Sequence, residues 1–133
     1  MRFRKNRLRL TRDIQRVLEQ GKTKKVSLEK NGAELFILKY YPYQHTRFTV
    51  IVSKKVAKKS VWRNRIKRII REAMRQLIKE GKSPNFDIVI LVRQNIYRMK
   101  SYELKEILEK VFDNINFASK EKTYEMNTEA KAK

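Results

Sequence analysis

A run of basic residues between positions 54 and 71 is the strongest chemical signal in this chain of 133 residues. The run holds nine lysines and arginines and no acid. Solvated helix faces usually mix the two signs, since like charges four residues apart cost about 0.2–0.5 kcal/mol per pair. Here Lys67 follows Arg63, and Arg71 follows Lys67, at that spacing. A fold that retains this penalty is expected to have phosphates nearby, so the run predicts contact with a nucleic acid rather than an ordinary solvated face.

On a helical wheel this segment separates into an apolar face and a basic face. The apolar face is expected to pack in the core and carries Trp62, Ile66, Ile69, Ile70, Ala73 and Leu77. Arginines of the basic face can grip phosphate with two bonds and stack on bases, which lysine cannot do. Asn64 adds a neutral donor and acceptor for a phosphate, a 2′-hydroxyl or a base edge. The residues predicted to bind nucleic acid, RNA or DNA, are Lys54, Lys55, Lys58, Lys59, Arg63, Asn64, Arg65, Lys67, Arg68 and Arg71.

Residues that could catalyse a reaction are not evident in the sequence. Hydrolysis of a phosphodiester by protein alone needs metal-binding carboxylates or a histidine pair, but His45 is the only histidine. The acids near the C-terminus have Lys105 and Lys110 as neighbours, as on a solvated face of mixed charge. There is no cysteine, which excludes disulfides and thiolate metal sites. We therefore expect no catalytic residue, metal or cofactor held by the protein alone.

The overall composition also predicts a polyanionic partner. Lys and Arg number 34 and Asp and Glu 14, for a formal net charge of +20, and a compact chain of this charge repels itself. A membrane surface is the main alternative to nucleic acid. The purest apolar run, residues 88–92, is far shorter than the roughly 20 residues of a spanning helix. The N-terminus lacks the apolar segment of a secretory signal, so we expect a cytoplasmic protein.

Hydrophobic periodicity predicts the element order α-β-β-β-α-β-α in one domain, residues 1–118. A basic arm at 1–10 is followed by Thr11, the expected N-cap of a helix that Gly21 ends. Three strands should form an antiparallel meander. They lie near 26–28, 35–38 and 48–53, with the turn Asn31-Gly32 between the first two.

The basic run falls in the next predicted helix. Ser60 is its expected N-cap, and the helix should end near Glu80, ahead of Gly81. Residues 86–92 form a strand that is nearly apolar throughout, so a central position in the sheet is expected. The unit from 48 to 92 can then be a parallel crossover.

A last helix, with Ser101 as its expected N-cap, completes the predicted domain. Its apolar face carries Leu104, Ile107, Leu108, Val111, Phe112 and Ile115. The fold class is α+β, with helices packed on one face of a four-stranded sheet. Residues 119–133 are polar without an apolar period, which predicts a disordered tail.

Two stretches around the basic run form a long and specific motif. They are Ser53-Lys54-Lys55-Val56 and Val61-Trp62-Arg63-Asn64-Arg65-Ile66-Lys67-Arg68-Ile69-Ile70-Arg71-Glu72. This motif resembles the signature of the protein subunit of bacterial ribonuclease P. Residues 6–9 and 13–18 look like the first helix of that family, and 86–90 followed by Arg93 looks like its fourth strand. The resemblance covers about residues 5 to 115.

The resemblance implies a fold with a left-handed β-α-β crossover, a rare exception to the handedness rule. It also implies that the protein binds a large catalytic RNA, and that the complex, an endoribonuclease, removes the 5′ leader from precursor tRNA. The RNA would supply the active site and hold the Mg²⁺ ions. The protein would grip the leader in a cleft between its first helix and the sheet, while Lys54 to Arg71 would face the catalytic RNA.

The cleft of this family is often lined by aromatic residues of the first helix, where this chain has Ile14 and Leu18. Stacking is worth about 1–3 kcal/mol per base, and aromatic residues of the second strand could supply it instead. Regular alternation places Phe36 and Tyr40 on one side of that strand and Tyr41 on the other. Core packing is the alternative for Phe36. The predicted cleft residues are Ile14, Leu18, Phe36 and Tyr40, with Lys39 as a further contact.

The net charge alone does not exclude two other functions. A ribosomal or other structural RNA-binding protein would use the basic helix as a clamp without any processing role. A DNA-binding factor would use residues 62–77 as a recognition helix, although no short helix-turn-helix precedes them. The context of Arg63-Asn64-Arg65 favours the ribonuclease P protein over both.

Overall fold

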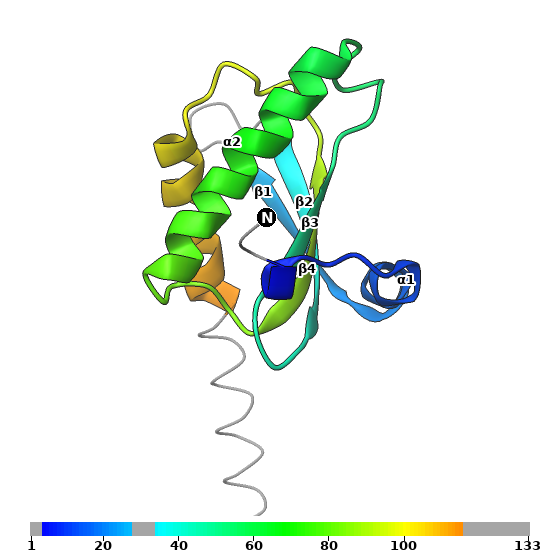
Figure 1. Cartoon of the computed structure of the whole chain (residues 1–133), viewed down its shortest axis with the longest axis vertical. Helices are drawn as coiled ribbons and strands as arrows, with labels where there is room; N and C mark the ends of the chain where they lie inside the picture. Colours follow the sequence, from blue (N-terminus) through cyan, green and yellow to red (C-terminus); the bar gives the residue numbers. More distant parts are fainter. Residues whose placement is uncertain (1–3, 28–33, 116–133) are drawn as a thin grey trace, which may run out of the picture.

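A four-stranded sheet forms the middle layer of the molecule (Figure 1). The computed structural model describes residues 4–27 and 34–115. The strands are β1 (Lys22–Ser27), β2 (Glu34–Pro42), β3 (Arg47–Ile51) and β4 (Phe86–Val92). The helices are η1, a short 3₁₀ turn (Arg4–Asn6), α1 (Thr11–Gln20), α2 (Ser60–Lys79) and a helix at residues 101–115. Apart from the short turn, this is the predicted order α-β-β-β-α-β-α.

The strands lie in the order β1-β2-β4-β3. β4 pairs with β2 antiparallel and with β3 parallel, so its predicted central position and the parallel crossover are both confirmed. The predicted meander is wrong at its third strand, because β4 separates β3 from β2. Ile88, Val89 and Ile90 are buried on alternating sides of β4, and only a central strand between helical layers can bury both sides. The left-handed sense of the crossover stays a prediction from the family.

Helices cover both faces of the sheet, with α1 and α2 on opposite sides (Figure 1). On the α2 side, Ile88 and Ile90 join the main core with the helix at 101–115, whose predicted apolar face is buried except for the half-buried Ile107. On the α1 side, Val89 packs with Leu8 and Val17. The expectation of helices on one face alone is therefore wrong, since the second face of β4 is apolar too.

The predicted helix boundaries are correct to within one residue. Thr11 and Ser60 were expected as N-caps, but each is the first helical residue, and Leu10 and Lys59 hold the N-cap positions. The last helix likewise begins at its expected cap, position 101. Gly81 follows α2 with a φ of 71°, the left-handed conformation expected there.

Gly21 ends α1 where the helix meets the sheet. A Cβ atom at this position would lie 2.3 Å from the carbonyl oxygen of Val17 and 2.8 Å from that of Tyr40. Both neighbours are backbone atoms, so no side chain can swing away to make room. Glycine therefore permits the close approach that fixes α1 against β2.

The described part of the predicted basic arm is held along the free edge of β3. The backbone N–H of Leu8 donates to the carbonyl of Phe48 (3.0 Å), and the Asn6 side-chain amide donates to the carbonyl of Thr46 (2.8 Å). Nε2 of His45 lies 2.6 Å from the carbonyl oxygen of Lys5.

The Asn31-Gly32 turn and the predicted tail lie outside the described residues. In the part of the chain that is described, no helix has the length and apolarity to cross a membrane.

A buried ion pair joins β3, β4 and α1. Asp87 is fully buried, and its two carboxylate oxygens accept hydrogen bonds from Nε and Nη2 of Arg47 at 2.7 and 2.6 Å. Nη1 of Arg47 lies 3.5 Å from a carboxylate oxygen of Asp13 in α1. The hydrogen bond that Arg47 donates to Asp87 raises the pKa of Arg47 above its ordinary value. Asp87 thus neutralises the charge of an arginine on the α1 side of the sheet.

We predict that Asp87→Asn lowers the free energy of unfolding by about 3 kcal/mol, because it removes the counter-charge of a largely buried arginine. Urea denaturation followed by circular dichroism measures the change. Glu72→Gln is the matched control: it breaks the exposed pair of Glu72 with Arg75 (3.4 Å) and should cost less than about 1 kcal/mol. A loss below about 1 kcal/mol for Asp87→Asn would show that the buried pair does not hold these layers together.

Candidate RNA interface

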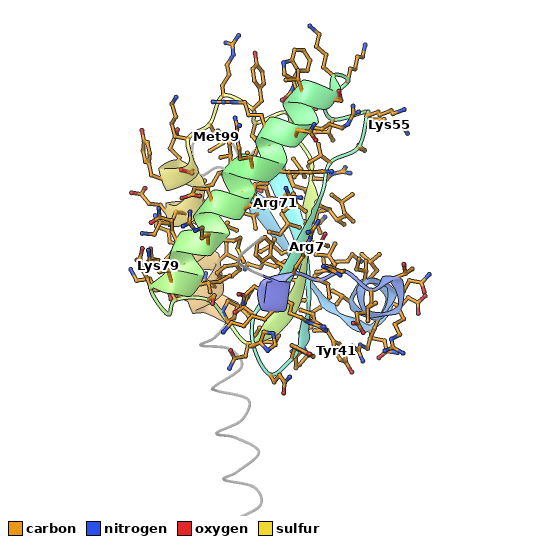
Figure 2. All side chains as sticks on the ribbon, viewed as in Figure 1. Arg7, Tyr41, Lys55, Arg71, Lys79 and Met99 are labelled. Carbon is orange, nitrogen blue, oxygen red and sulfur yellow. The ribbon has the colours of Figure 1, made fainter. Side chains whose placement is uncertain are left out.

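The basic face of α2 has the predicted arrangement. Ile66, Ile70 and Leu77 are fully buried against the sheet, whereas Arg68 and Arg71 are exposed. In Figure 2, Lys55 lies in the segment before α2, and Arg71 and Lys79 lie along the helix. The predicted lysines at 54, 55, 58 and 59 are also exposed, in the turns that lead into α2. The helix and the turns before it therefore present one cationic face that extends to Arg71.

None of the nine cations in this segment forms an ion pair with a carboxylate of residues 4–27 or 34–115. Acids pair with cations elsewhere. Glu80, after the end of α2, contacts Lys82 (3.3 Å) and Lys105, and its hydrogen bond with Lys105 lowers the pKa of Glu80. The positive charge of residues 54–71 thus lacks a carboxylate partner within the described ranges, which favours a polyanion as the partner of this segment.

Two of the predicted arginines also organise the backbone around the helix. Nη1 of Arg63 donates to the carbonyls of Ala57 (2.9 Å) and Lys58 (2.8 Å), which orders the turn that carries the lysines. Nε of Arg65 donates to the carbonyl of Tyr97 (2.6 Å), which fixes the loop after β4. Arg63 and Arg65 therefore hold other cationic groups in place, a role that the sequence did not indicate.

The loop held by Arg65 contributes residues that the sequence analysis missed. The Tyr97 ring stacks on Trp62 of α2, with centroids 5.3 Å apart and planes at 22°. The next residue, Arg98, is exposed and places its guanidinium carbon 5.5 Å from the Tyr97 ring centroid. The sequence does contain a pattern that indicates these binding residues, because segment 93–100 has an aromatic residue among three cations.

The four residues predicted to line a leader cleft do not come together. Ile14 and Leu18 of α1 pack on the α1 side of the sheet, next to Tyr41. Phe36 is fully buried in the core on the α2 side, and Tyr40 packs against that core too. The alternation of β2 points these two rings away from α1, so the core alternative for Phe36 is correct.

A hollow of about 430 Å³ does lie on the α1 side, lined by Arg7, Leu8, Arg9, Ile14 and Thr49. Two of its lining residues are exposed arginines from the segment that precedes α1. Lys39 also lies on this side, with Nζ 3.5 Å from the carbonyl oxygen of Leu18. The walls of the hollow combine aliphatic surface with positive charge, which suits a single-stranded nucleic acid better than a neutral ligand.

No three His, Cys, Asp or Glu side chains gather into a metal site within the described ranges. The chemistry that this arrangement offers is binding: cations for phosphates, and aromatic or aliphatic surface for bases and sugars.

Comparison with known proteins gives one consistent result. A family model described as Ribonuclease P matches residues 3–116. A ribonuclease P protein component from Coxiella burnetii (strain Dugway 5J108-111) is 34% identical over 88 residues, which cover 64% of this chain and 71% of that protein. The solved ribonuclease P protein of Staphylococcus aureus is 26% identical, with a TM-score of 0.62 over 83% of this chain and 94% of that one. That of Thermotoga maritima is 27% identical, with a TM-score of 0.64 over 81% and 96%.

We predict that Arg68→Ala with Arg71→Ala weakens binding to a long structured RNA. The slope of log K against log salt concentration should shrink by about one for each phosphate that is no longer neutralised, so by about two. These residues are preferable to Arg65, whose removal would also release the Tyr97 loop. Filter binding at several salt concentrations gives the slope.

Lys79→Ala with Lys110→Ala is the control pair. It removes the same charge from exposed positions at the end of α2 and on the last helix. If both double variants keep the wild-type slope, the basic face of α2 is only solvated.

Proposed function

The chain belongs to the ribonuclease P protein family, and from this premise we propose how its two cationic surfaces divide the work. As the protein component, it is part of the endoribonuclease that acts on tRNA precursors, and its partner is the ribonuclease P RNA. Family membership does not favour a structural RNA-binding protein without a processing role. The residues that meet each RNA, described below, are our proposal.

The basic face of α2 binds the catalytic RNA in this proposal. The observation that carries it is the run of nine cations, from Lys54 to Arg71, without a carboxylate partner among the described residues. RNA segments that pack near an active site repel one another through their phosphates. Protein cations among them relieve this repulsion, as Mg²⁺ would, so the protein should lower the Mg²⁺ concentration that the RNA needs.

The hollow on the α1 side binds the 5′ leader of precursor tRNA in this proposal. Arg7 and Arg9 are placed to contact the phosphates of a single strand, and Ile14 offers aliphatic surface to its bases and sugars. Tyr41, with Arg16 at 5.6 Å from its ring centroid, offers an aromatic ring on this side. Aliphatic contact carries little hydrogen-bond information, so such a site would accept many leader sequences.

The sheet separates the two proposed surfaces, with α2 on one face and the hollow on the other. One protein can therefore hold the catalytic RNA and the leader together without competition between them. Mg²⁺ is proposed to be held mainly by the RNA, whose phosphates supply the oxygen ligands that this ion prefers. The RNA then catalyses the cleavage of precursor tRNA, and the protein positions this substrate. We also propose a cytoplasmic location, as expected for a protein that acts on newly made tRNA precursors.

Reconstitution tests the proposed role of α2. The whole protein, mixed with a bacterial ribonuclease P RNA at low Mg²⁺, should accelerate cleavage of precursor tRNA at the 5′ end of the mature sequence. Arg68→Ala with Arg71→Ala should reduce this stimulation, and Lys79→Ala with Lys110→Ala should keep it. Product formation on gels measures the rate. Absence of stimulation with every bacterial ribonuclease P RNA tried would contradict the proposal.

A second experiment tests the leader site. Arg7→Gln with Arg9→Gln should weaken binding of precursor tRNA to the reconstituted enzyme by roughly ten-fold, because neither glutamine can neutralise a phosphate of the leader. Mature tRNA, which has no leader, should bind as before. Equilibrium binding of the two RNAs to the same enzyme preparation makes the comparison. An equal weakening for both would place the two arginines against the tRNA body or the catalytic RNA instead.

A further inference from the structure

An aromatic pair with a cation beside each ring lies at the N-terminal end of α2. The rings of Trp62 and Tyr97 are stacked, with centroids 5.3 Å apart. Nζ of Lys59 lies 4.9 Å from the Trp62 centroid, and the guanidinium carbon of Arg98 lies 5.5 Å from the Tyr97 centroid. Both aromatic side chains are half-buried and both cations are exposed. Two segments that are distant in the chain thus bring a stacked pair of rings to the surface, with one cation beside each ring.

The pair is held in place by its surroundings. Trp62 lies in the first turn of α2 and packs against the edge of the main core. Two contacts hold the backbone of Tyr97, and a third reaches its hydroxyl. Nε of Arg65 donates to its carbonyl (2.6 Å), its N–H donates to the Asn95 side-chain oxygen (3.3 Å), and Nε of Arg98 donates to its hydroxyl (3.0 Å). A platform that is ordered before binding loses little entropy when a ligand settles on it.

Core packing alone does not explain the pair. The side chains of α2 that fill the core, such as Ile66 and Ile70, are fully buried, whereas Trp62 and Tyr97 are both only half-buried. Proteins that bind unpaired nucleotides combine aromatic faces for the bases with cations for the phosphates. Lys59 and Arg98 are exposed side chains that lie over the rings, so both can turn to the phosphates of a nucleotide that stacks there, with Arg98 giving up its bond to the Tyr97 hydroxyl.

We propose that an unpaired nucleotide of the ribonuclease P RNA stacks its base on the Trp62–Tyr97 pair while Lys59 and Arg98 bind the adjoining phosphates. This inference rests on the proposed function of α2. The catalytic RNA is the occupant because the pair continues the cationic face of α2, while the hollow proposed for the leader lies on the other face of the sheet. Every base has a π face, so the site selects an unpaired nucleotide rather than a base identity.

Trp62 is the only tryptophan in the chain, so its fluorescence reports on this site alone. The full-length protein is titrated with a bacterial ribonuclease P RNA, and binding is followed independently by filter retention. Stacking should quench the emission in proportion to the bound fraction and should protect Trp62 from acrylamide. Phosphate contact without stacking would leave the ring accessible to acrylamide and would overturn the proposal.

The same titration separates this inference from the function on which it rests. An RNA that binds and stimulates cleavage while the emission and accessibility of Trp62 stay unchanged overturns the stacking site alone. An RNA that neither binds nor stimulates overturns both. Precursor tRNA without the catalytic RNA is the third arm, and equal protection of Trp62 in that arm would assign the platform to the substrate and overturn the proposal.

A substitution of Trp62 tests how much its aromatic ring contributes to the affinity for the catalytic RNA. Trp62→Leu keeps an apolar contact with the core but removes the aromatic face, and should weaken binding of the catalytic RNA roughly ten-fold. Tyr102→Leu is the control, since Tyr102 is an exposed aromatic residue (65%) on the next helix, outside the stacked pair. Melting temperatures are measured for both variants. Wild-type affinity in a folded Trp62→Leu protein would overturn the proposal.

Discussion

The apolar character of β4 on both of its faces is the constraint on which the architecture depends. A strand of this kind must be covered by protein on each side, and here α2 covers one side and α1 the other. The two proposed RNA-binding surfaces therefore lie on opposite sides of the same sheet. Asp87 is the only charged residue in β4, and its bidentate pair with Arg47 ties β4 to β3 and, through Asp13, to α1.

Charge is distributed unevenly over this framework. Acids pair with cations near the end of α2, where Glu80 meets Lys82 and Lys105, and inside the molecule at Asp87. The start of α2 has no such partners among the described residues, and two of its arginines donate to backbone carbonyls that position the neighbouring loops. The interface thus combines mobile exposed cations with arginines that keep the loops in place. The exposed cations should make the affinity for RNA depend on salt concentration. The arginines that hold the loops should make it depend on how well those loops are packed.

The sequence predicted well what is encoded locally and poorly what depends on distant neighbours. The two faces of α2 could be predicted because one helix carries both the apolar and the basic period. The strand order could not, since the pattern of β3 says nothing about which strand lies beside it. In β2, apolar residues occupy consecutive positions 35–38, so alternation grouped Phe36 with Tyr40 but did not tell which face meets the core, and Phe36 was predicted as a cleft residue with core packing as the alternative. Tyr97 was missed because its stacking partner, Trp62, is far away in sequence.

The place of β4 also affects how the protein is made. Among the strands of the described residues, β4 is the last to be synthesised, yet it must enter between β2 and β3, which leave the ribosome earlier. Until then, each of those strands has an edge without its final partner, and the apolar sides of α1 and α2 have no complete sheet to pack on. A chain cut short before residue 86 would lack the centre of both layers. Translation that stops early should therefore yield a fragment that proteases remove, and not a partial protein that occupies the RNA.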